Sequence, residues 1–487
     1  MLVLSAPLSR TSSPDDPGQN ASEVAAPGKI GYLLEAGSVR KWASAGCPKE
    51  DVMIETPRLV GIWSIGVSVG LGCLFALAFD SSALGYTEAS RYVFCSEKNC
   101  RDGYASDGVA MDQSGNIYGV TDAGGRYDSG VVYEYSPGTG KYSVLYDFCR
   151  KLRKLRCRGR TPGRVKLVID TAGNLYGTTE FGGNNKMDGG VIFELSPGTR
   201  RWHERLLHVF CQHGTCSDGA CPLDGLTYAG AAAGQAYDGV SPLYGTTDVG
   251  GAFSEGTVFS IVPNSDGGKA AYTVLYSFCA QRNCTDGLDV DTPLYMDSAG
   301  NIYGTTEQGG QSDKGVVFEL SSNGSSYSQS VLYSFCQQAN CTDGAYPNGG
   351  VIMDLSGNLV GTAGGGTNAD GLVFELSLNS GKWQYSVLDN FDGTNGRGPG
   401  SLMIDGSGNF FGATYTGGQK NDGTVFEFNG SIQSLYSFCL VKGCADGKLP
   451  EATLVEDASG NLYGTTLEEG EGYENGGTLY ELSPSRK

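Results

Sequence analysis

The residues of this chain with the plainest chemistry are cysteines that come in pairs. Five pairs have the form Phe-Cys-x4-Cys and a sixth is longer: Cys95 and Cys100, Cys149 and Cys157, Cys211 and Cys216, Cys279 and Cys284, Cys336 and Cys341, and Cys439 and Cys444. Such local pairs predict disulfides formed in an oxidising compartment. Zinc binding is the weaker interpretation, because pairs on successive repeats lie too far apart to pool four ligands. We expect no metal and no cofactor.

One cysteine of the repeat region, Cys221, is left over by this pairing. We expect it to be a buried thiol or a site of intermolecular pairing.

An Asp-Gly dipeptide follows the second cysteine of most pairs. The aspartates are Asp102, Asp218, Asp286, Asp343 and Asp446, with Asp392 in a repeat that lacks the cysteines. Two interpretations are open. A ring of carboxylates, with Asp286, Asp343 and Asp446 as candidates, could bind cations or sugar hydroxyls. Alternatively, Asp-Gly is only the turn that redirects the chain into the next strand.

The second repeat breaks this acidic pattern. Between Arg150 and Arg160, seven of eleven residues are Arg or Lys, in a protein of net charge −19. Arg153, Lys154 and Arg156 are therefore candidates for binding a polyanion or an acidic glycan. A solvated, protease-sensitive loop is the alternative. Nucleic acid is not expected as a partner, because the rest of the surface repels phosphate.

This chain has very few histidines that could support catalysis or metal binding. The only three histidines, His203, His208 and His213, cluster around one strand-like run. A histidine-based triad or metal centre at the middle of the molecule is therefore not expected. Acid–base catalysis by two carboxylates stays possible, but the acids recur with the repeats and no pair stands out. The catalytic residues, if there are any, are unknown.

These residues are positioned by a repeated unit that occurs seven times, with a period of 51 to 68 residues. Its marker is an Asn after Gly, replaced by Pro242 in the third unit: Asn116, Asn174, Asn301, Asn358, Asn409 and Asn461. Four strand-like runs recur in each unit. In the fourth unit they are 293–297, 301–306, 315–320 and 330–335. All are rich in Val, Ile, Tyr, Phe and Thr and are bounded by turn residues.

Four-stranded units repeated in this way predict an all-β fold, a seven-bladed β-propeller over residues 90–484. The last unit stops after its third strand, at Thr478–Ser483, whereas Arg91–Cys95 matches a fourth strand without strands of its own. We therefore expect the N-terminal strand to complete the last blade and close the ring, which leaves no exposed sheet edge. In such a blade the cystine loops follow the fourth strand and the double-glycine loops join the second strand to the third. Both kinds of loop emerge on one face, where we expect function.

The pattern Gly-Asn-Leu-Tyr-Gly-Thr-Thr, a double Gly and Gly-Thr-Val-Phe-Glu-Leu resembles the GloVer tandem repeat over roughly residues 92–484. The resemblance implies a propeller-like, exported bacterial protein of undefined activity, and it brings no catalytic residues. Two repeats depart from the pattern, the third at Ser241-Pro242 and the fifth at Val360–Ala363. We expect those two blades to be distorted.

The segment before the ring has a different composition. Residues 1–52 are rich in Ser, Pro and Gly, and we expect a disordered extension or a start codon placed too early. Within residues 53–80, the uncharged run Leu59–Phe79 predicts a signal peptide cleaved after Ala78, or an uncleaved signal-anchor. In either case the ring is exported and extracellular or on the cell surface, and such an anchor would be its only membrane contact.

Two functions fit these observations. The first is a noncatalytic scaffold that binds glycans, cell-wall material or protein through the loop face. The second is a carboxylate-dependent carbohydrate-active enzyme or lyase. Near-identical motifs in every unit favour the first, because no unit is enriched in catalytic residue types.

Overall fold

This computed structural model describes residues 85–149, 157–183, 187–212, 214–264, 266–324, 326–450, 453–468 and 476–485, and the backbone of 31–35 and 38–42. The chain divides into two compact units. In the first, the described residues form the antiparallel hairpin of β1 (Gly31–Glu35) and β2 (Ser38–Trp42). Residues 53–80 and the rest of 1–52 lie outside the described residues, so the signal peptide and the disordered extension stay predictions. None of the described residues forms a helix long and apolar enough to cross a bilayer.

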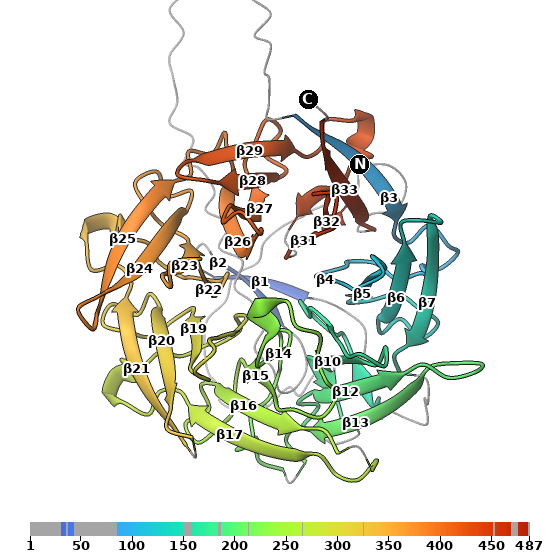
Figure 1. Cartoon of the computed structure of the whole chain (residues 1–487), viewed down its shortest axis with the longest axis horizontal. Helices are drawn as coiled ribbons and strands as arrows, with labels where there is room; N and C mark the ends of the chain where they lie inside the picture. The colour runs from blue at the N-terminus through green and yellow to red at the C-terminus, as the bar shows by residue number, and fades with distance from the viewer. Residues whose placement is uncertain are drawn as a thin grey trace, which may run out of the picture. The chain divides into compact units, whose positions relative to one another are not determined.

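The second unit is a seven-bladed propeller, as the repeats predict. Figure 1 shows its sheets arranged around a central axis, each with four main strands that are antiparallel to their neighbours. The first three blades consist, from the inner to the outer strand, of β4 (Val109–Met111), β5 (Ile117–Thr121), β6 (Val131–Ser136) and β7 (Lys141–Asp147); β9 (Val168–Ile169), β10 (Leu175–Thr179), β12 (Val191–Ser196) and β13 (His203–Val209); and β14 (Thr227–Tyr228), β15 (Leu243–Thr247), β16 (Thr257–Val262) and β17 (Ala271–Ser277).

The next three blades follow the same order. They consist of β18 (Tyr295–Met296), β19 (Ile302–Thr306), β20 (Val316–Ser322) and β21 (Tyr327–Ser334); β22 (Val351–Met353), β23 (Leu359–Ala363), β24 (Leu372–Asn379) and β25 (Lys382–Asn390); and β26 (Arg397–Ile404), β27 (Phe410–Thr416), β28 (Thr424–Phe428) and β29 (Ile432–Ser437). The third and fifth blades, for which we expect a distortion, both keep four strands in the common order.

The seventh blade is closed by the N-terminal strand. It contains β31 (Val455–Glu456), β32 (Leu462–Glu468), β33 (Thr478–Pro484) and β3 (Tyr86–Val93), with the short β30 (Lys448–Pro450) also pairing with β32. The antiparallel register of β3 and β33 runs from Tyr86↔Pro484 to Val93↔Thr478. An ion pair of 2.9 Å between Arg91 and Glu481 reinforces this pairing. The predicted closure is therefore confirmed, and it pairs the edge of β33 that would otherwise be free.

The hydrophobic core is divided among the junctions between blades. Seven clusters of buried residues each combine side chains from two adjacent blades. Between blades 3 and 4, for example, Phe278 packs edge to face against Phe318, with ring centroids 5.1 Å apart. Burial of such a ring contributes about 1.5–3 kcal/mol to stability. Because each blade has apolar residues on both faces, its strands do not alternate cleanly between apolar and polar residues.

The structure explains two of the repeated sequence motifs directly. A Cβ on Gly304, in the Tyr-Gly-Thr-Thr motif, would lie 2.7 Å from the Phe318 ring, so the glycine leaves room for that ring in the neighbouring strand. In the Asp-x-x-Gly-Asn turn, Asp297 accepts hydrogen bonds from the backbone and side chain of Asn301 at 2.8 and 2.9 Å. This hairpin is thus held by its own aspartate.

Short elements lie outside the blade strands. The two-residue strands β8 (Gly159–Arg160) and β11 (Phe181–Gly182) pair near the second blade. The connection between β14 and β15 contains η1 (Ala231–Ala233). Three cystine loops contain η2 (Arg282–Cys284), η3 (Ala339–Cys341) and η4 (Lys442–Cys444).

Candidate functional site

The cystine loops form as the cysteine spacing predicts. All six pairs are disulfides: Cys95 with Cys100, Cys149 with Cys157, Cys211 with Cys216, Cys279 with Cys284, Cys336 with Cys341, and Cys439 with Cys444. Each loop connects the outer strand of one blade to the inner strand of the next. Cys221 is completely buried but is itself disulfide-bonded, so the expectation of a buried thiol is wrong.

The double-glycine loops lie on the same face as the cystine loops and are bonded to them. The amide of Gly310 donates a hydrogen bond of 3.0 Å to the carbonyl of Cys284, and Gly251 does the same to Cys216 at 2.8 Å. A Cβ on Gly309 would lie 2.7 Å from the Cys284 carbonyl oxygen, and the φ of this residue is +78°. Glycine is therefore required where the two loops meet.

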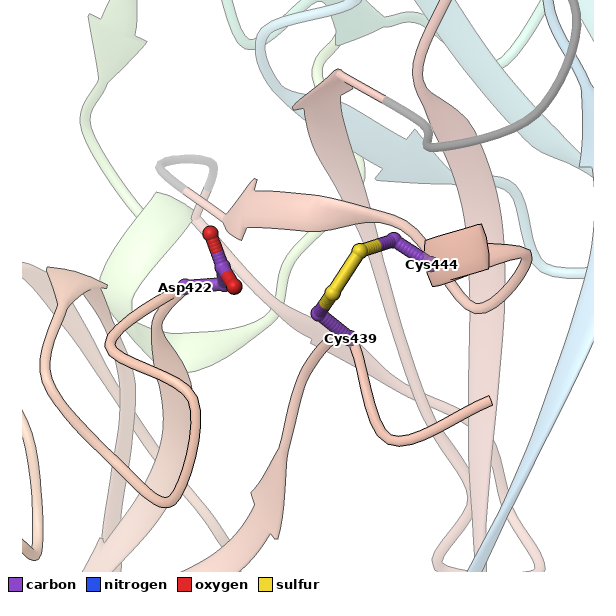
Figure 2. Close-up of side chains that lie close together, drawn as sticks. All are labelled: Asp422, Cys439 and Cys444. Atoms are coloured by element: carbon purple, nitrogen blue, oxygen red, sulfur yellow. A yellow bond between two sulfur atoms is a disulfide. The ribbon is translucent and has the colours of Figure 1, made fainter. Parts of the chain in front are cut away.

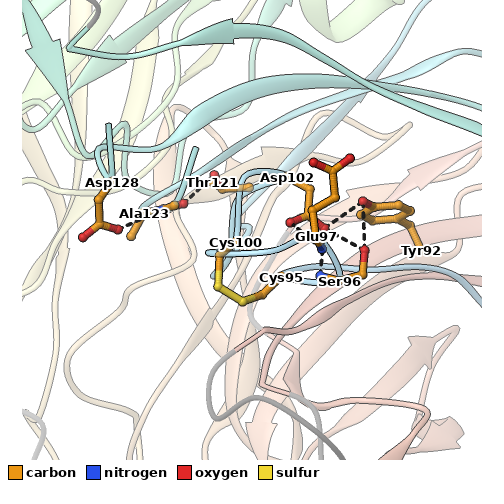
Figure 3. Close-up of a disulfide and its surroundings, with 10 residues drawn as sticks. Tyr92, Cys95, Ser96, Glu97, Cys100, Asp102, Thr121, Ala123 and Asp128 are labelled. Carbon is orange, nitrogen blue, oxygen red and sulfur yellow. Dashed lines mark hydrogen bonds between the residues drawn. A yellow bond between two sulfur atoms is a disulfide. The ribbon is translucent and has the colours of Figure 1, made fainter. Parts of the chain in front are cut away.

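The aspartate of each Asp-Gly holds its cystine loop from inside, in an arrangement that we call the aspartate clamp. Asp343 is completely buried. Its carboxylate accepts hydrogen bonds from the amides of Gln337 and Gln338 at 2.8 and 3.1 Å and from the Tyr333 hydroxyl at 2.6 Å. Asp286 and Asp446 are held in the same way. Figure 3 shows the clamp formed by Asp102, with Tyr92, Ser96 and Glu97 around the carboxylate.

The next blade covers the clamp. Tyr385, at the start of the following outer strand, stacks on Tyr333 with ring centroids 3.7 Å apart. Its hydroxyl donates a hydrogen bond to the backbone carbonyl of Asp343. Burial and the hydrogen bond to Asp343 raise the pKa of Tyr333, which keeps its hydroxyl protonated as a donor. Tyr142 stacks on Tyr92 in the same way, with ring centroids 3.8 Å apart.

These contacts bear on the candidate ligand-binding residues. The structure buries Asp286, Asp343 and Asp446 and turns their carboxylates into the loops, which favours the turn interpretation of Asp-Gly. Ligand binding by these three carboxylates stays a prediction that needs the loops to open. Arg153, Lys154 and Arg156 lie outside the described residues, so their role also stays a prediction.

The clamp varies at three of the seven junctions. Between blades 2 and 3, His208 takes the place of the tyrosine, lies 2.9 Å from Asp218 and stacks on Tyr272. Of the other histidines, His203 begins β13 and His213 lies outside the described residues. Between blades 5 and 6 there is no cystine, and Asp392 instead accepts bonds from Thr394 and Asn395 in an exposed turn.

The third variation lies between blades 1 and 2, beside the Cys149–Cys157 loop. There Arg158 precedes the loop glycine, where the other loops have aspartate. A cavity of about 180 Å³ opens at this junction and is lined in part by Arg158, Arg201, Trp202 and Glu204.

A cluster of carboxylates lies at the junction of blades 3 and 4. Burial raises the pKa of Asp248 well above its ordinary value, and the negative charge of Asp291 adds to this effect. Burial and Asp291 also raise the pKa of Asp224, and they raise that of Asp289 to about 6. Among the described residues, the buried Thr246 hydroxyl on β15 has no hydrogen-bond partner. Carboxylates with raised pKa values can exchange protons near neutral pH, and the sequence missed this cluster because its members belong to no shared motif.

The described residues contain one group whose donor atoms are close enough to share a metal ion, Asp422, Cys439 and Cys444. Figure 2 shows that the two sulfur atoms of this group are joined to each other. Cysteines in a disulfide are not thiolates, so this group does not offer the ligands of a zinc site.

Comparisons with known proteins identify the repeat. The model of a family described as Gloeobacter/Verrucomicrobia repeat matches the chain over residues 48–242, 234–401 and 362–487. This match confirms the resemblance found in the sequence. No curated protein matches the chain.

Among solved structures, one similar chain is the alpha-L-arabinanase of Penicillium chrysogenum complexed with arabinobiose. It is 12% identical with a TM-score of 0.42, and the match covers 65% of this chain and 92% of that chain. Another is a fungal alcohol oxidase of the AA5 family in complex with copper. It is 15% identical with a TM-score of 0.47, and the match covers 82% of this chain and 76% of that chain. No functional conclusion follows from either likeness.

Proposed function

The chain belongs to the Gloeobacter/Verrucomicrobia repeat family, and from that premise we propose that it is an exported scaffold that binds glycans, cell-wall material or protein. It binds through the face that carries the cystine and double-glycine loops, and it catalyses no reaction. Six local disulfides support an oxidising, extracellular or cell-surface location.

The observation that carries this proposal is the rigidity with which the loop face is built. At five junctions a cystine and an aspartate clamp fix the loop, and the double-glycine loops at Gly251 and Gly310 bond to cystine-loop carbonyls. A loop that is fixed before binding loses little entropy when a ligand arrives. Rigid scaffolds that present loops on one face are a common basis for binding surfaces.

The carboxylates between blades 3 and 4 favour a second candidate, a carboxylate-dependent carbohydrate-active enzyme or lyase. Asp289, with its pKa near 6, could act as the acid, and a neighbouring carboxylate as the base. We rank this candidate second, because Asp248 and Asp291, which lie beside Asp289, are buried.

The test uses the protein purified with its disulfides intact. Retention on immobilised pectate, heparin, peptidoglycan and neutral galactan is measured, and the soluble products are analysed after long incubation. The proposal expects retention on at least one polymer without new reducing ends or unsaturated products. Turnover that is lost in Asp289→Asn but kept in Asp392→Asn would establish the enzyme instead. No retention on any of the four polymers would overturn the glycan-binding function.

A further inference from the structure

One junction of the ring has its clamp charges reversed. In the loop between blades 1 and 2, Arg158 and Gly159 occupy the positions of Asp286 and Gly287 in the loop between blades 3 and 4. The two glycines confirm this equivalence, since a Cβ on either would contact the last threonine of the second strand, Thr179 or Thr306. Arginine therefore stands where an aspartate carboxylate holds the other cystine loops.

The partner residue on the following blade has changed with it. Tyr142 and Tyr272 each lie seven residues before the first cysteine of their loop, and each hydroxyl bonds to the clamp aspartate of the preceding loop. Glu204 has this position in the second blade. Its carboxylate lies 3.4 Å from the Arg158 guanidinium, with only 5% of the Glu204 side chain exposed. Glu204 and Arg158 therefore occupy the positions that Tyr142 and Asp102 have at the junction of blades 7 and 1.

This exchange leaves a cavity where stacked rings cover the clamps of Asp102, Asp218 and Asp343. The cavity has a volume of about 180 Å³ and is lined by Tyr146, Arg158, Arg201, Trp202, His203 and Glu204, together with Cys149. Trp202 also packs against the core cluster between blades 1 and 2. The volume is below the roughly 300 Å³ of a drug-sized pocket, which suits a single ring or substituent.

Arg158 and Arg201, which line this cavity, are available to a ligand, whereas the neighbouring arginines are paired with carboxylates. Arg160 is paired with Asp188, and Arg205 with Glu194. Arg158 forms the 3.4 Å ion pair with Glu204, and 39% of its side chain stays exposed. Arg201 is exposed and forms no ion pair within the described part of the chain. In a protein of net charge −19, this is a surface that can attract an anion.

We propose that this cavity binds one anionic sugar residue of an extracellular polysaccharide. Arg158 and Arg201 bind the carboxylate or sulfate, because the guanidinium group matches the geometry of such anions. Trp202 offers a flat apolar surface to the sugar ring. This inference rests on the proposed binding function and names its ligand class and its place on the ring.

The test compares three single variants by titration calorimetry with a galacturonate tetrasaccharide. Arg201→Ala removes an exposed cation, and Trp202→Ala removes the aromatic surface. Each is expected to weaken binding by about tenfold or more, as is usual for central Arg and Trp contacts. Arg200→Ala is the matched control, because Arg200 is exposed and adjacent but does not line the cavity. It is expected to change affinity less than about threefold, the scale of a peripheral charge.

Two further ligands identify the anion. A heparin tetrasaccharide is expected to bind at the same site, whereas neutral galactotetraose is not. Binding of only one acidic ligand assigns the site to carboxylate or to sulfate. Equal binding of the neutral sugar would overturn the role of the arginines.

A double variant tests the reversed clamp itself. Arg158→Asp with Glu204→Tyr gives the residue types found at the Asp102 and Asp343 clamps, with Tyr146 in place to donate to the new aspartate. It is expected to abolish binding while the thermal midpoint stays equal or rises. Retained affinity would overturn the proposal. If the wild-type protein binds the acidic ligand and all variants bind alike, the cavity is not the site, although the proposed function survives. If the wild-type protein binds no polysaccharide, this inference and the glycan-binding form of the proposed function both fail.

Discussion

At the scale of single residues, the Asp-Gly dipeptide contributes differently to stability in different repeats. Asp343 is buried and bonds to two amides and one hydroxyl, whereas Asp392 lies in an exposed turn. We expect Asp343→Ala to destabilise the protein by about 2–4 kcal/mol, because three part-buried donors lose the buried carboxylate that accepts from them. Chemical denaturation monitored by tryptophan fluorescence measures the change.

The control is Asp392→Ala, for which we expect a loss below about 1 kcal/mol, since water can replace an exposed acceptor. If the two substitutions cost the same, Asp343 does not hold its loop.

Asp289 makes stability depend on pH. Burial, followed by the charges of Asp291, Glu255 and Asp313, raises its pKa to about 6. The unfolded chain has the ordinary value of about 3.9. The folded state therefore binds the proton more tightly, and the penalty of the charged form is complete above about pH 6 and disappears as the pH falls toward 4.

This sign predicts the behaviour of Asp289→Asn. The amide cannot ionise, and its oxygen can still accept the hydrogen bond from Gln308. We expect the variant to be more stable than the wild-type protein near pH 7.5 and to show a smaller gain on acidification to about pH 5. Thermal midpoints at the two pH values measure this. An unchanged pH dependence would mean that folding does not raise the pKa of Asp289.

At the scale of elements, each cystine loop has its own stabilising effect. Replacing Cys336 and Cys341 by serine frees a six-residue loop, and the chain-entropy estimate for that loop is about 2 kcal/mol. We expect the double variant to fold, because the Asp343 clamp stays and the junction at Asp392 has no cystine by nature. Denaturation of the two proteins side by side measures the loss. A variant that does not fold would show that the clamp alone cannot hold the loop.

The sequence predicted the elements well and the candidate site only in part. Strands such as β19 and β20 lie within one residue of the predicted runs at their start, because alternating turn and strand residues mark them locally. The reversed clamp was missed because its residues, Arg158 and Glu204, are adjacent only after the blades have packed. The basic composition around Arg150–Arg160 was its one visible signal, and that signal pointed to the neighbouring positions.

At the scale of the whole molecule, closure of the ring depends on one N-terminal strand. Deletion of residues 1–94 removes β3 and leaves the edge of β33 unpaired. We expect this protein to aggregate or to lose its cooperative unfolding, because exposed sheet edges pair with other chains. Deletion of residues 1–84 is the control and keeps β3. Size-exclusion chromatography distinguishes them, and two equally monodisperse proteins would contradict the role of closure.

The central claim is that one junction of a repeated scaffold has become a binding site. Hydrogen exchange with and without saturating galacturonate tetrasaccharide tests it directly, since all seven junctions are observed at once. The account predicts added protection in the peptides around Tyr146–Asp147, Arg158–Gly159 and Arg201–Glu204, and none at the clamps of Asp286, Asp343 and Asp446. Equal protection at every junction, or protection confined to the carboxylates between blades 3 and 4, would contradict it.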